Sequence, residues 1–225
     1  MNQTNEKEIK SSPPVEVSEK EEKKEKNTLK DFGDLLETTL ISCFSVIVIF
    51  SFLFRPVIID GRSMNNTFND ADRVFMTSMF YKPKCGDVVI INQDKAYLLD
   101  DNDDVYSAPG LEKCIIKRVI AVGGQTLDID FNTGTVTRDG EVLDEKYVNG
   151  STVVDEGGFS FPITVPDGYV FVMGDNREHS TDSRSTLVGL IPEDNVSGRV
   201  VAKYYPFSEF KIIKNDDGSS EGSGK

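Results

Sequence analysis

An uncharged apolar run near the N-terminus limits most strongly what this chain can fold into. The run extends from Thr38 to Phe54 and reads TTLISCFSVIVIFSFLF. Its seventeen residues would rise roughly 25 Å as a helix, which is near the lower limit for crossing the hydrocarbon core of a bilayer. No other helix of matching hydrophobicity is evident that could bury this run in a core. We therefore expect one transmembrane anchor, over residues 35–57.

The residues around this run argue against a cleaved signal peptide. A long tail precedes the run, and Arg55-Pro56-Val57-Ile58 follows it in place of a small-x-small cleavage site. Lysines gather shortly before the run, and fewer basic residues follow at a comparable distance: Lys20, Lys23, Lys24, Lys26 and Lys30 against Arg55, Arg62 and Arg73. The positive-inside rule then predicts a cytoplasmic N-terminus and places the rest of the chain on the other side.

Composition and charge restrict the class of partner. The 225 residues are enough for a substantial core in one or two domains. A formal net charge of −13 argues against a nucleic-acid partner, because phosphate binding needs clustered Lys and Arg. We interpret the acidic segment Asp100–Asp104 as solvated surface. No Cys/His spacing indicates zinc, so we expect neither a metal nor a cofactor. Cys85 and Cys114 could form one disulfide on an oxidising side of the membrane.

The two ends of the chain differ in composition from its middle. Residues 1–34 have few large apolar side chains and cannot bury enough surface to offset their ordering entropy, so we expect a disordered cytoplasmic tail there. Residues 214–225 are rich in Asp, Gly and Ser and are predicted to be a flexible tail. The remaining segment, residues 58–213, should form the folded extracytoplasmic domain.

That middle segment is typical of antiparallel β structure. Short runs rich in Val and Ile alternate with turn residues, and Asp139-Gly140 between two runs predicts a tight hairpin. No amphipathic helix of convincing length appears. The expected strands are Arg73–Ser78, Asp87–Ile91, Cys114–Val122, Thr126–Asp130, Thr135–Arg138, Glu141–Leu143, Tyr169–Met173 and Arg199–Tyr205. We predict a mainly β fold, an antiparallel sheet with a smaller β extension behind a single N-terminal helix.

Ser63 is the candidate nucleophile, because it lies nine residues beyond Phe54 and so close to the membrane surface. A serine hydroxyl needs a neighbouring base to remove its proton. Lys117 is one candidate, since it lies within the apolar stretch Cys114–Val122, and burial among apolar side chains lowers the pKa of a lysine. Lys117 could equally extend from its strand to water.

His179, the only histidine, is the other candidate base. It belongs to the polar loop Gly174–Arg184, which reads GDNREHSTDSR, and Asp182 could orient it as in a catalytic triad. The loop also suits a hydrogen-bond hub, because Asp175 and Asp182 can each accept a bidentate pair from an arginine. A well-paired structural turn would have the same composition, so the residues alone leave the choice of base open.

Four blocks in order resemble the bacterial type I signal peptidases, which are membrane-bound serine proteases with a Ser-Lys dyad that remove signal peptides. The blocks are IDGRSMNNT (Ile59–Thr67), GDVV (Gly86–Val89), KRVIAVGGQ (Lys117–Gln125) and the loop Gly174–Arg184. The resemblance spans nearly all of residues 35–207 and is to the Gram-positive-like form with one N-terminal anchor. It implies a serine endopeptidase that acts through an acyl-enzyme and needs no cofactor.

The resemblance also implies site residues. Ser63 resembles the family's acyl-forming nucleophile, and Lys117 resembles its general base. Ser180 resembles the serine that hydrogen-bonds this lysine, and Asp182 and Arg184 resemble the supporting pair. A histidine is not needed at position 179 in the family, so the resemblance favours the lysine as the base.

Two residues depart from the family pattern. Asn66 stands where the S-M-x-P-T block usually has proline, which could loosen the turn behind the nucleophile. Gly61 stands where some members place a serine that contributes to the oxyanion hole, so stabilisation would rest on the Ser63 amide and other backbone donors. We expect the substrate to add as an extended strand beside Asp60–Arg62 or at another exposed edge.

The implied partners are signal peptides of exported preproteins, with small side chains at the −1 and −3 positions, together with membrane lipid and the secretion translocon. The implied location is the bacterial cytoplasmic membrane, crossed once. Two rival functions remain at this point: a cell-wall transpeptidase that uses Cys114 with His179 and an arginine, and a non-catalytic membrane-tethered β domain. Self-cleaving Ser-Lys repressors share the chemistry, but they lack an anchor of this kind.

Overall fold

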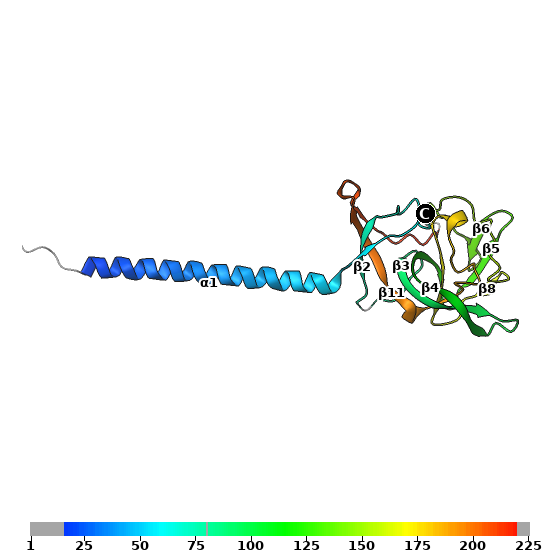
Figure 1. The fold of residues 1–225 in the computed structure, drawn as a ribbon, viewed down its shortest axis with the longest axis horizontal. Coiled ribbons are helices and arrows are strands. Elements are labelled where there is room, and N and C mark those ends of the chain that lie inside the picture. Colours follow the sequence, from blue (N-terminus) through cyan, green and yellow to red (C-terminus); the bar gives the residue numbers. More distant parts are fainter. Residues whose placement is uncertain (1–15, 80, 220–225) are drawn as a thin grey trace, which may run out of the picture. The chain divides into compact units, whose positions relative to one another are not determined.

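The structure is a computed structural model that describes residues 16–79 and 81–219. It consists of one long helix and, among the described residues, twelve β-strands (Figure 1). The chain divides into two compact units, residues 1–51 and 52–225, each of which is described by itself. The mainly β fold behind a single N-terminal helix is confirmed.

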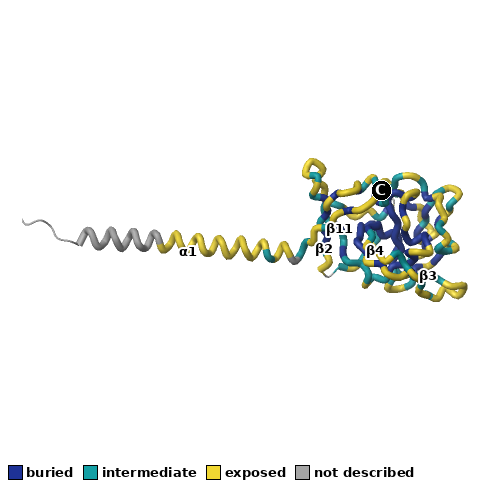
Figure 2. The backbone as a smooth tube through the Cα atoms, viewed as in Figure 1, coloured by how far each residue is buried: buried dark blue, intermediate teal, exposed yellow. Residues whose placement is uncertain are grey.

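Helix α1 (Glu16–Leu53) contains the apolar run. Its stretch Lys30–Ser51 is long and apolar enough to cross a membrane. Large apolar side chains along this stretch are exposed, for example Phe44 at 67% and Ile47 at 63% (Figure 2). Apolar side chains on all faces of an exposed helix indicate a lipid environment rather than a protein core. The helix ends at Leu53, before the predicted end of the anchor at residue 57, because Arg55–Ile58 join the sheet instead.

Part of the predicted N-terminal tail is helical. Residues 1–15 of this tail lie outside the described residues, whereas residues 16–34 form the beginning of α1, which contradicts their predicted disorder. Glu and Lys dominate this stretch, and both are strong helix formers. A helix that is already formed in the apolar run can extend into such a sequence, because propagation costs much less than nucleation.

The strands of the second unit form two antiparallel sheets. The large sheet has the order β1-β2-β11-β3-β4-β9-β10, with β12 paired to β11, and the small sheet has the order β7-β6-β5-β8. The large sheet comprises β1 (Arg55–Ile58), β2 (Arg73–Thr77), β3 (Val88–Leu99), β4 (Val105–Val122), β9 (Tyr169–Met173), β10 (Ile191–Pro192), β11 (Val196–Tyr205) and β12 (Lys211–Ile212). The small sheet comprises β5 (Thr126–Asp130), β6 (Thr135–Arg138), β7 (Glu141–Val142) and β8 (Ile163–Thr164). The small sheet is the predicted β extension.

The eight predicted strands are all present, but two are much longer than expected. β3 and β4 pair from Val88 with Arg118 out to Leu99 with Val105, which makes a long hairpin. The acidic segment 100–104 forms its tip, where Asp100 Oδ1 accepts the N–H of Asn102 at 2.8 Å. The outer half of β4 is mostly exposed, and in β3 the polar stretch Asn92–Lys95 separates the inner apolar run from buried Ala96 and Leu98, which interrupts the pattern that identified the inner half. The predicted tight turn at Asp139-Gly140 is confirmed, with both residues at positive φ.

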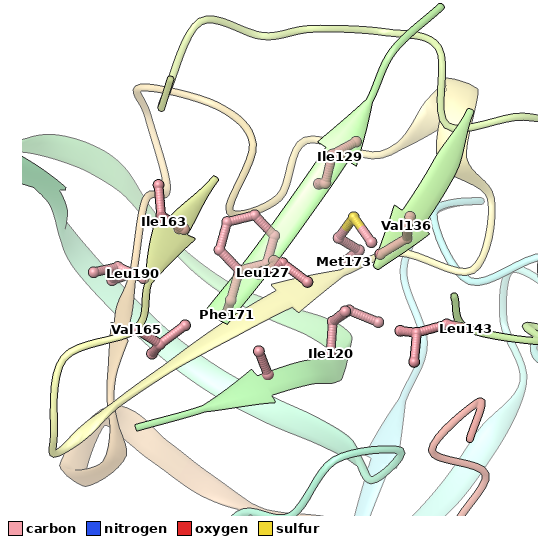
Figure 3. Close-up of a cluster of buried hydrophobic side chains, with 11 residues drawn as sticks. Ile120, Leu127, Ile129, Val136, Leu143, Ile163, Val165, Phe171, Met173 and Leu190 are labelled. Atoms are coloured by element: carbon pink, nitrogen blue, oxygen red, sulfur yellow. The ribbon is translucent and has the colours of Figure 1, made fainter. Parts of the chain in front are cut away.

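A buried apolar cluster joins the two sheets. Figure 3 shows side chains of the small sheet meeting side chains of β4 and β9: Leu127, Ile129 and Val136 against Ile120, Phe171 and Met173. A second cluster lies around β2, β3 and the loop after β1, and it includes Ile59, Met64 and Phe68. This second cluster fixes the segment that carries Ser63.

The C-terminal segment is ordered against the domain as far as the structure describes it, which contradicts the predicted flexible tail for residues 214–219. Asn215 Nδ2 donates to Cys85 O at 2.7 Å, and Asp144 N–H donates to Gly218 O at 2.7 Å. These contacts are hydrogen bonds, which composition does not reveal. Residues 220–225 lie outside the described residues. The thiols of Cys85 and Cys114 are free, so the candidate disulfide is not formed.

Candidate active site

Ser63 is presented by a turn whose flanking side chains are buried. Met64 and Phe68 are 1% and 0% exposed in the second apolar cluster, while Ser63 is half-buried. The Asn65 N–H donates to Arg62 O at 3.2 Å, and the Phe68 N–H donates to Met64 O at 2.8 Å. Backbone hydrogen bonds therefore close the turn that contains Asn66.

Lys117 lies on β4 and meets Ser63. Its Nζ is 2.8 Å from Ser63 Oγ and donates to Ile116 O at 3.0 Å. The side chain is only 4% exposed. Burial lowers the pKa of Lys117 to about 8, although the carboxylates of Asp182 and Asp175 act in the opposite direction. A lysine with this pKa is neutral in a useful fraction of molecules near pH 8, and a neutral amine can accept a proton.

The neighbouring Arg118 points to the opposite face of β4 and is also buried, at 3% exposure. It makes a bidentate ion pair with Asp175, with Nη2 2.7 Å from Oδ2 and Nε 2.9 Å from Oδ1. Its guanidinium also lies 3.8 Å from the centre of the Tyr147 ring. Neither basic residue reaches solvent, so the alternative in which Lys117 extends to water does not apply.

The polar loop Gly174–Arg184 is held by a fully buried ion pair. Arg184 Nε lies 2.9 Å from Asp182 Oδ1, and both side chains are 0% exposed. Asp182 also accepts the Gly174 N–H at 2.9 Å, and Arg184 donates to Arg177 O at 2.8 Å. The predicted pairing of Asp182 with Arg184 is therefore present, and it closes the loop beside Lys117.

Ser180 and His179 differ from what the sequence suggested. Ser180 Oγ is buried and has no hydrogen-bond partner within the described part of the chain, so the expected bond to Lys117 is absent. Lys117 Nζ is instead directed at Ser63 and at a backbone carbonyl. His179 is exposed in a short 3-10 helix, Arg177–His179. Asp182 is paired with Arg184 and does not orient the histidine, so the structure does not assemble a Ser-His-Asp triad.

Asn176 is a site residue that the sequence interpretation missed. Its backbone N–H donates to Ser63 O at 3.0 Å, and its side-chain Nδ2 donates to Arg62 O at 3.1 Å. One residue thus binds two successive carbonyls of the nucleophile turn. Its position in the polar loop, next to Asp175, was the only feature of the sequence that could have indicated a role for it. An amide side chain that binds backbone carbonyls far away in sequence leaves no spacing pattern.

The residues before Ser63 form a bend. β1 ends at Ile58, so Asp60–Arg62, beside which the substrate strand is expected, do not themselves form a strand. Gly61 has a φ of +95°, which disfavours a serine at this position, and its N–H donates to Asp70 Oδ1 at 2.8 Å. The side chains of Asp60 and Arg62 are exposed. The Ser63 N–H makes no hydrogen bond to any group within residues 16–79 and 81–219.

A cavity of about 830 Å³ lies behind the nucleophile turn, lined by Thr67, Arg118, Tyr147 and the C-terminal segment. Its lining contains neither Ser63 nor Lys117. The volume of this cavity therefore does not identify the active site. The pair of groups that could react, Lys117 Nζ and Ser63 Oγ, lies outside it. We place the candidate site at Ser63 and Lys117.

Comparison with known proteins decides the family. A family model described as "Signal peptidase, peptidase S26" matches residues 32–205. The chain belongs to the S26 signal peptidases. It is 33% identical over 163 residues to a probable signal peptidase I-1 from Synechocystis sp. This match covers 71% of this chain and 75% of the relative. It is 31% identical over 207 residues to signal peptidase I T from Bacillus subtilis. That match covers 88% of this chain and 96% of the relative.

A crystal structure of a signal peptidase I from Enterococcus faecalis is also similar to this S26 peptidase. The two chains share 24% sequence identity with a TM-score of 0.36, and the match covers 53% of this chain and 97% of the other.

Proposed function

We propose that this S26 peptidase cleaves N-terminal signal peptides from exported preproteins with Ser63 as the nucleophile and Lys117 as the general base. The observation that carries this assignment is the 2.8 Å contact between Ser63 Oγ and the buried Lys117 Nζ. Family membership supports a serine endopeptidase that acts on signal peptides. Lys117 is the buried base candidate, whereas His179 is exposed.

The proposed reaction is acyl transfer in two steps. Neutral Lys117 takes the Ser63 hydroxyl proton while Oγ attacks the carbonyl carbon at the end of the signal peptide. Lys117 then gives that proton to the leaving amine of the mature protein, which leaves an ester on Ser63. In the second step Lys117 takes a proton from water, the hydroxide attacks the ester, and the proton returns to Ser63 Oγ. The lysine is neutral again after each step.

The oxyanion of each tetrahedral intermediate needs hydrogen-bond donors. We propose the Ser63 N–H for this task, since it donates to no acceptor within the described residues. Asn176 supports the assignment, because it binds the carbonyls of Arg62 and Ser63 and so fixes the peptide plane between them. One such donor contributes about 3 kcal/mol to transition-state stabilisation.

The remaining residues would act through position. We propose that Asp182 and Arg184 hold the loop against Gly174, since the Asp182 carboxylate accepts the Gly174 N–H. Ser180 would then shape the wall beside Ser63 rather than bind the lysine. The bend Asp60–Arg62 would lie along the bound substrate segment, whose extended backbone can pair with exposed backbone groups.

The protein is anchored in a membrane, as α1 and the family both indicate. We further propose that the catalytic domain faces the outside of a bacterial cytoplasmic membrane and takes its substrates near the translocon. The lysine-rich stretch before the span supports this orientation. A site close to the membrane surface suits the substrate, because a signal peptide's cleavage site follows its own apolar segment.

The pH dependence of cleavage tests the base. With a synthetic preprotein peptide in detergent, kcat/KM should rise with pH through an apparent pKa of about 8, because only neutral Lys117 can accept the proton. The same rise should appear in the variant His179→Ala. A histidine base would give a rise near pH 6.5. Loss of activity in His179→Ala would contradict the assignment.

The variant Asn176→Ala tests the oxyanion geometry. It removes the bond from Nδ2 to Arg62 O but keeps the backbone bond to Ser63 O. We expect kcat to fall about tenfold with KM little changed, since the lost contact positions a donor used only in the transition state. Steady-state kinetics on one peptide measures both constants. A change confined to KM would mean that Asn176 serves binding instead.

A further inference from the structure

The proposed oxyanion geometry depends on Asn176, and a single residue holds the backbone on both sides of it. The N–H of Asn149 donates to Asp175 O at 2.7 Å, and the N–H of Arg177 donates to Asn149 O at 3.1 Å. Asn149 and Asn176 thus form a parallel β-bridge. Asn149 belongs to the connection between β7 and β8, residues 143–162. This connection therefore supports the residue that binds the nucleophile turn.

The side chain of Arg177 makes a second link between this connection and the polar loop. It is 1% exposed. Its Nη2 lies 2.5 Å from Glu145 Oε1, its Nη1 lies 2.8 Å from Glu145 Oε2, and Nη1 also donates to Thr152 Oγ1 at 2.7 Å. On the other side, Nε donates to Gly174 O at 3.1 Å. Gly174 packs so closely on the nucleophile turn that a Cβ there would lie 2.5 Å from Ser63 O.

Glu145 supplies the charge that this buried guanidinium needs, and the mechanism gives it no other task. Its side chain is 10% exposed, and in the part of the chain that the structure describes it is the one ion-pair partner of Arg177. The carboxylate also accepts the Tyr147 hydroxyl at 2.8 Å. A buried charge that loses its partner is strongly disfavoured, so without Glu145 the Arg177 side chain should move toward water. Its bond to Gly174 O would then be lost.

We propose that Glu145 is a positioning residue: through Arg177 it holds the polar loop so that Asn176 keeps the Ser63 N–H directed at the oxyanion. The inference rests on the proposed function, because it requires an oxyanion formed at Ser63. The Glu145 carboxylate bonds to Arg177 and Tyr147 and to neither member of the dyad. Glu145→Ala should therefore lower kcat about tenfold with KM little changed, since a misplacement well below 1 Å costs less than the 100-fold expected for 1 Å.

Two inhibitors distinguish positioning from general support of the fold. A peptide aldehyde bonds through its carbonyl carbon to Ser63 Oγ, the hydroxyl proton passes to Lys117, and the aldehyde oxygen takes the place of the oxyanion. The cleaved signal peptide binds without forming a bond. In full-length Glu145→Ala the inhibition constant of the aldehyde should rise about tenfold, in step with the fall in kcat, and that of the cleaved peptide should stay at the wild-type value. Loss of general support would weaken both inhibitors together.

A double variant tests the route through Asn176. If Glu145 acts by holding Asn176, the loss of kcat in Glu145→Ala, Asn176→Ala should be smaller than the product of the two single losses. Losses that multiply in full would show that the two residues act independently and would overturn the proposal.

Two matched controls lie beside Glu145. Asp144→Ala removes a neighbouring carboxylate whose ion pair with Lys146 is exposed, and it should keep the wild-type kcat and inhibition constants. Tyr147→Phe removes the hydroxyl that donates to Glu145 but keeps the ring over Arg118, and it should also leave the aldehyde constant unchanged. A tenfold rise in Tyr147→Phe would assign the effect to Tyr147 and overturn the role of Arg177.

The outcomes separate this inference from the proposed function. If the wild type leaves a signal-peptide substrate uncut, the proposed function is overturned and the inference with it. If the wild type cleaves it and Glu145→Ala keeps the wild-type kcat and aldehyde constant, or changes KM alone, only the inference is overturned. If Glu145→Ala does not fold, Glu145→Gln decides, because it keeps the volume and one acceptor oxygen. It should raise the aldehyde constant about threefold, and an unchanged constant would overturn the inference.

Discussion

Ser63→Ala and Lys117→Met should each lower kcat/KM for a signal-peptide substrate by at least about 10⁴-fold. Ser63→Ala removes the atom that forms the ester. Lys117→Met removes the base that lies 2.8 Å from Ser63 Oγ and keeps a side chain of similar length. A dyad acts as a unit, so the double variant should be no less active than either single one. Peptide cleavage followed by chromatography measures these losses.

The fold should survive both changes. Lys117 is buried, so replacing it with methionine removes the cost of burying an amine, which offsets the loss of its hydrogen bonds to Ser63 Oγ and Ile116 O. Ser63 is only half-buried, and its hydroxyl contacts the same amine. Thermal unfolding should therefore show a midpoint equal to or above that of the wild type, which separates loss of chemistry from loss of structure.

Lys113→Met is the matched control for Lys117→Met. Lys113 lies on the same strand but is exposed, so its replacement should leave activity unchanged. His179→Ala should also remain active. An inactive His179→Ala together with an active Lys117→Met would reverse the assignment of the base.

The apolar pattern could predict the inner part of the domain because strands there are buried. Residues 116–121 of β4 are all buried, with β3 and β9 on either side, and they read as an unbroken apolar run apart from the two basic residues. The outer half of the β3–β4 hairpin could not be predicted in this way. Most of its β4 side chains are exposed, and buried Ala96 and Leu98 of β3 are separated from the inner apolar run by Asn92, Gln93, Asp94 and Lys95.

The site was only partly readable from the residues. Alternation along a strand places Lys117 and Arg118 on opposite faces, but the burial of both depends on what covers each face. Asp175 covers Arg118, and the nucleophile turn covers Lys117, from 57 and 54 positions away in sequence. The spacing of residues in the sequence could not predict that Ser63 and Lys117 lie together. That prediction came from the resemblance to the family. The bonds of Asn176 follow from the same tertiary contacts.

Gly174→Ala should lower kcat about 100-fold or more, because a 1 Å misplacement of reacting groups has a cost of this size. A Cβ atom at Gly174 would lie 2.5 Å from Ser63 O and 2.5 Å from Ser180 Cβ, which is closer than real Cβ contacts allow. The backbone carbonyl of the nucleophile itself must then move, and Ser63 Oγ moves with it, away from Lys117. The Gly174 N–H bond to Asp182 would remain, so the loop should still form.

Gly110→Ala is the matched control for Gly174→Ala. A Cβ at Gly110 would lie 2.7 Å from the backbone of Lys95, a clash of similar severity in the distal hairpin. It should lower the unfolding midpoint but leave kcat near the wild-type value. The double variant Gly174→Ala, Ser180→Gly relieves the contact with Ser180 and leaves the contact with Ser63. Recovery of activity in this double variant would place the damage at Ser180, whereas continued inactivity would place it at the nucleophile turn.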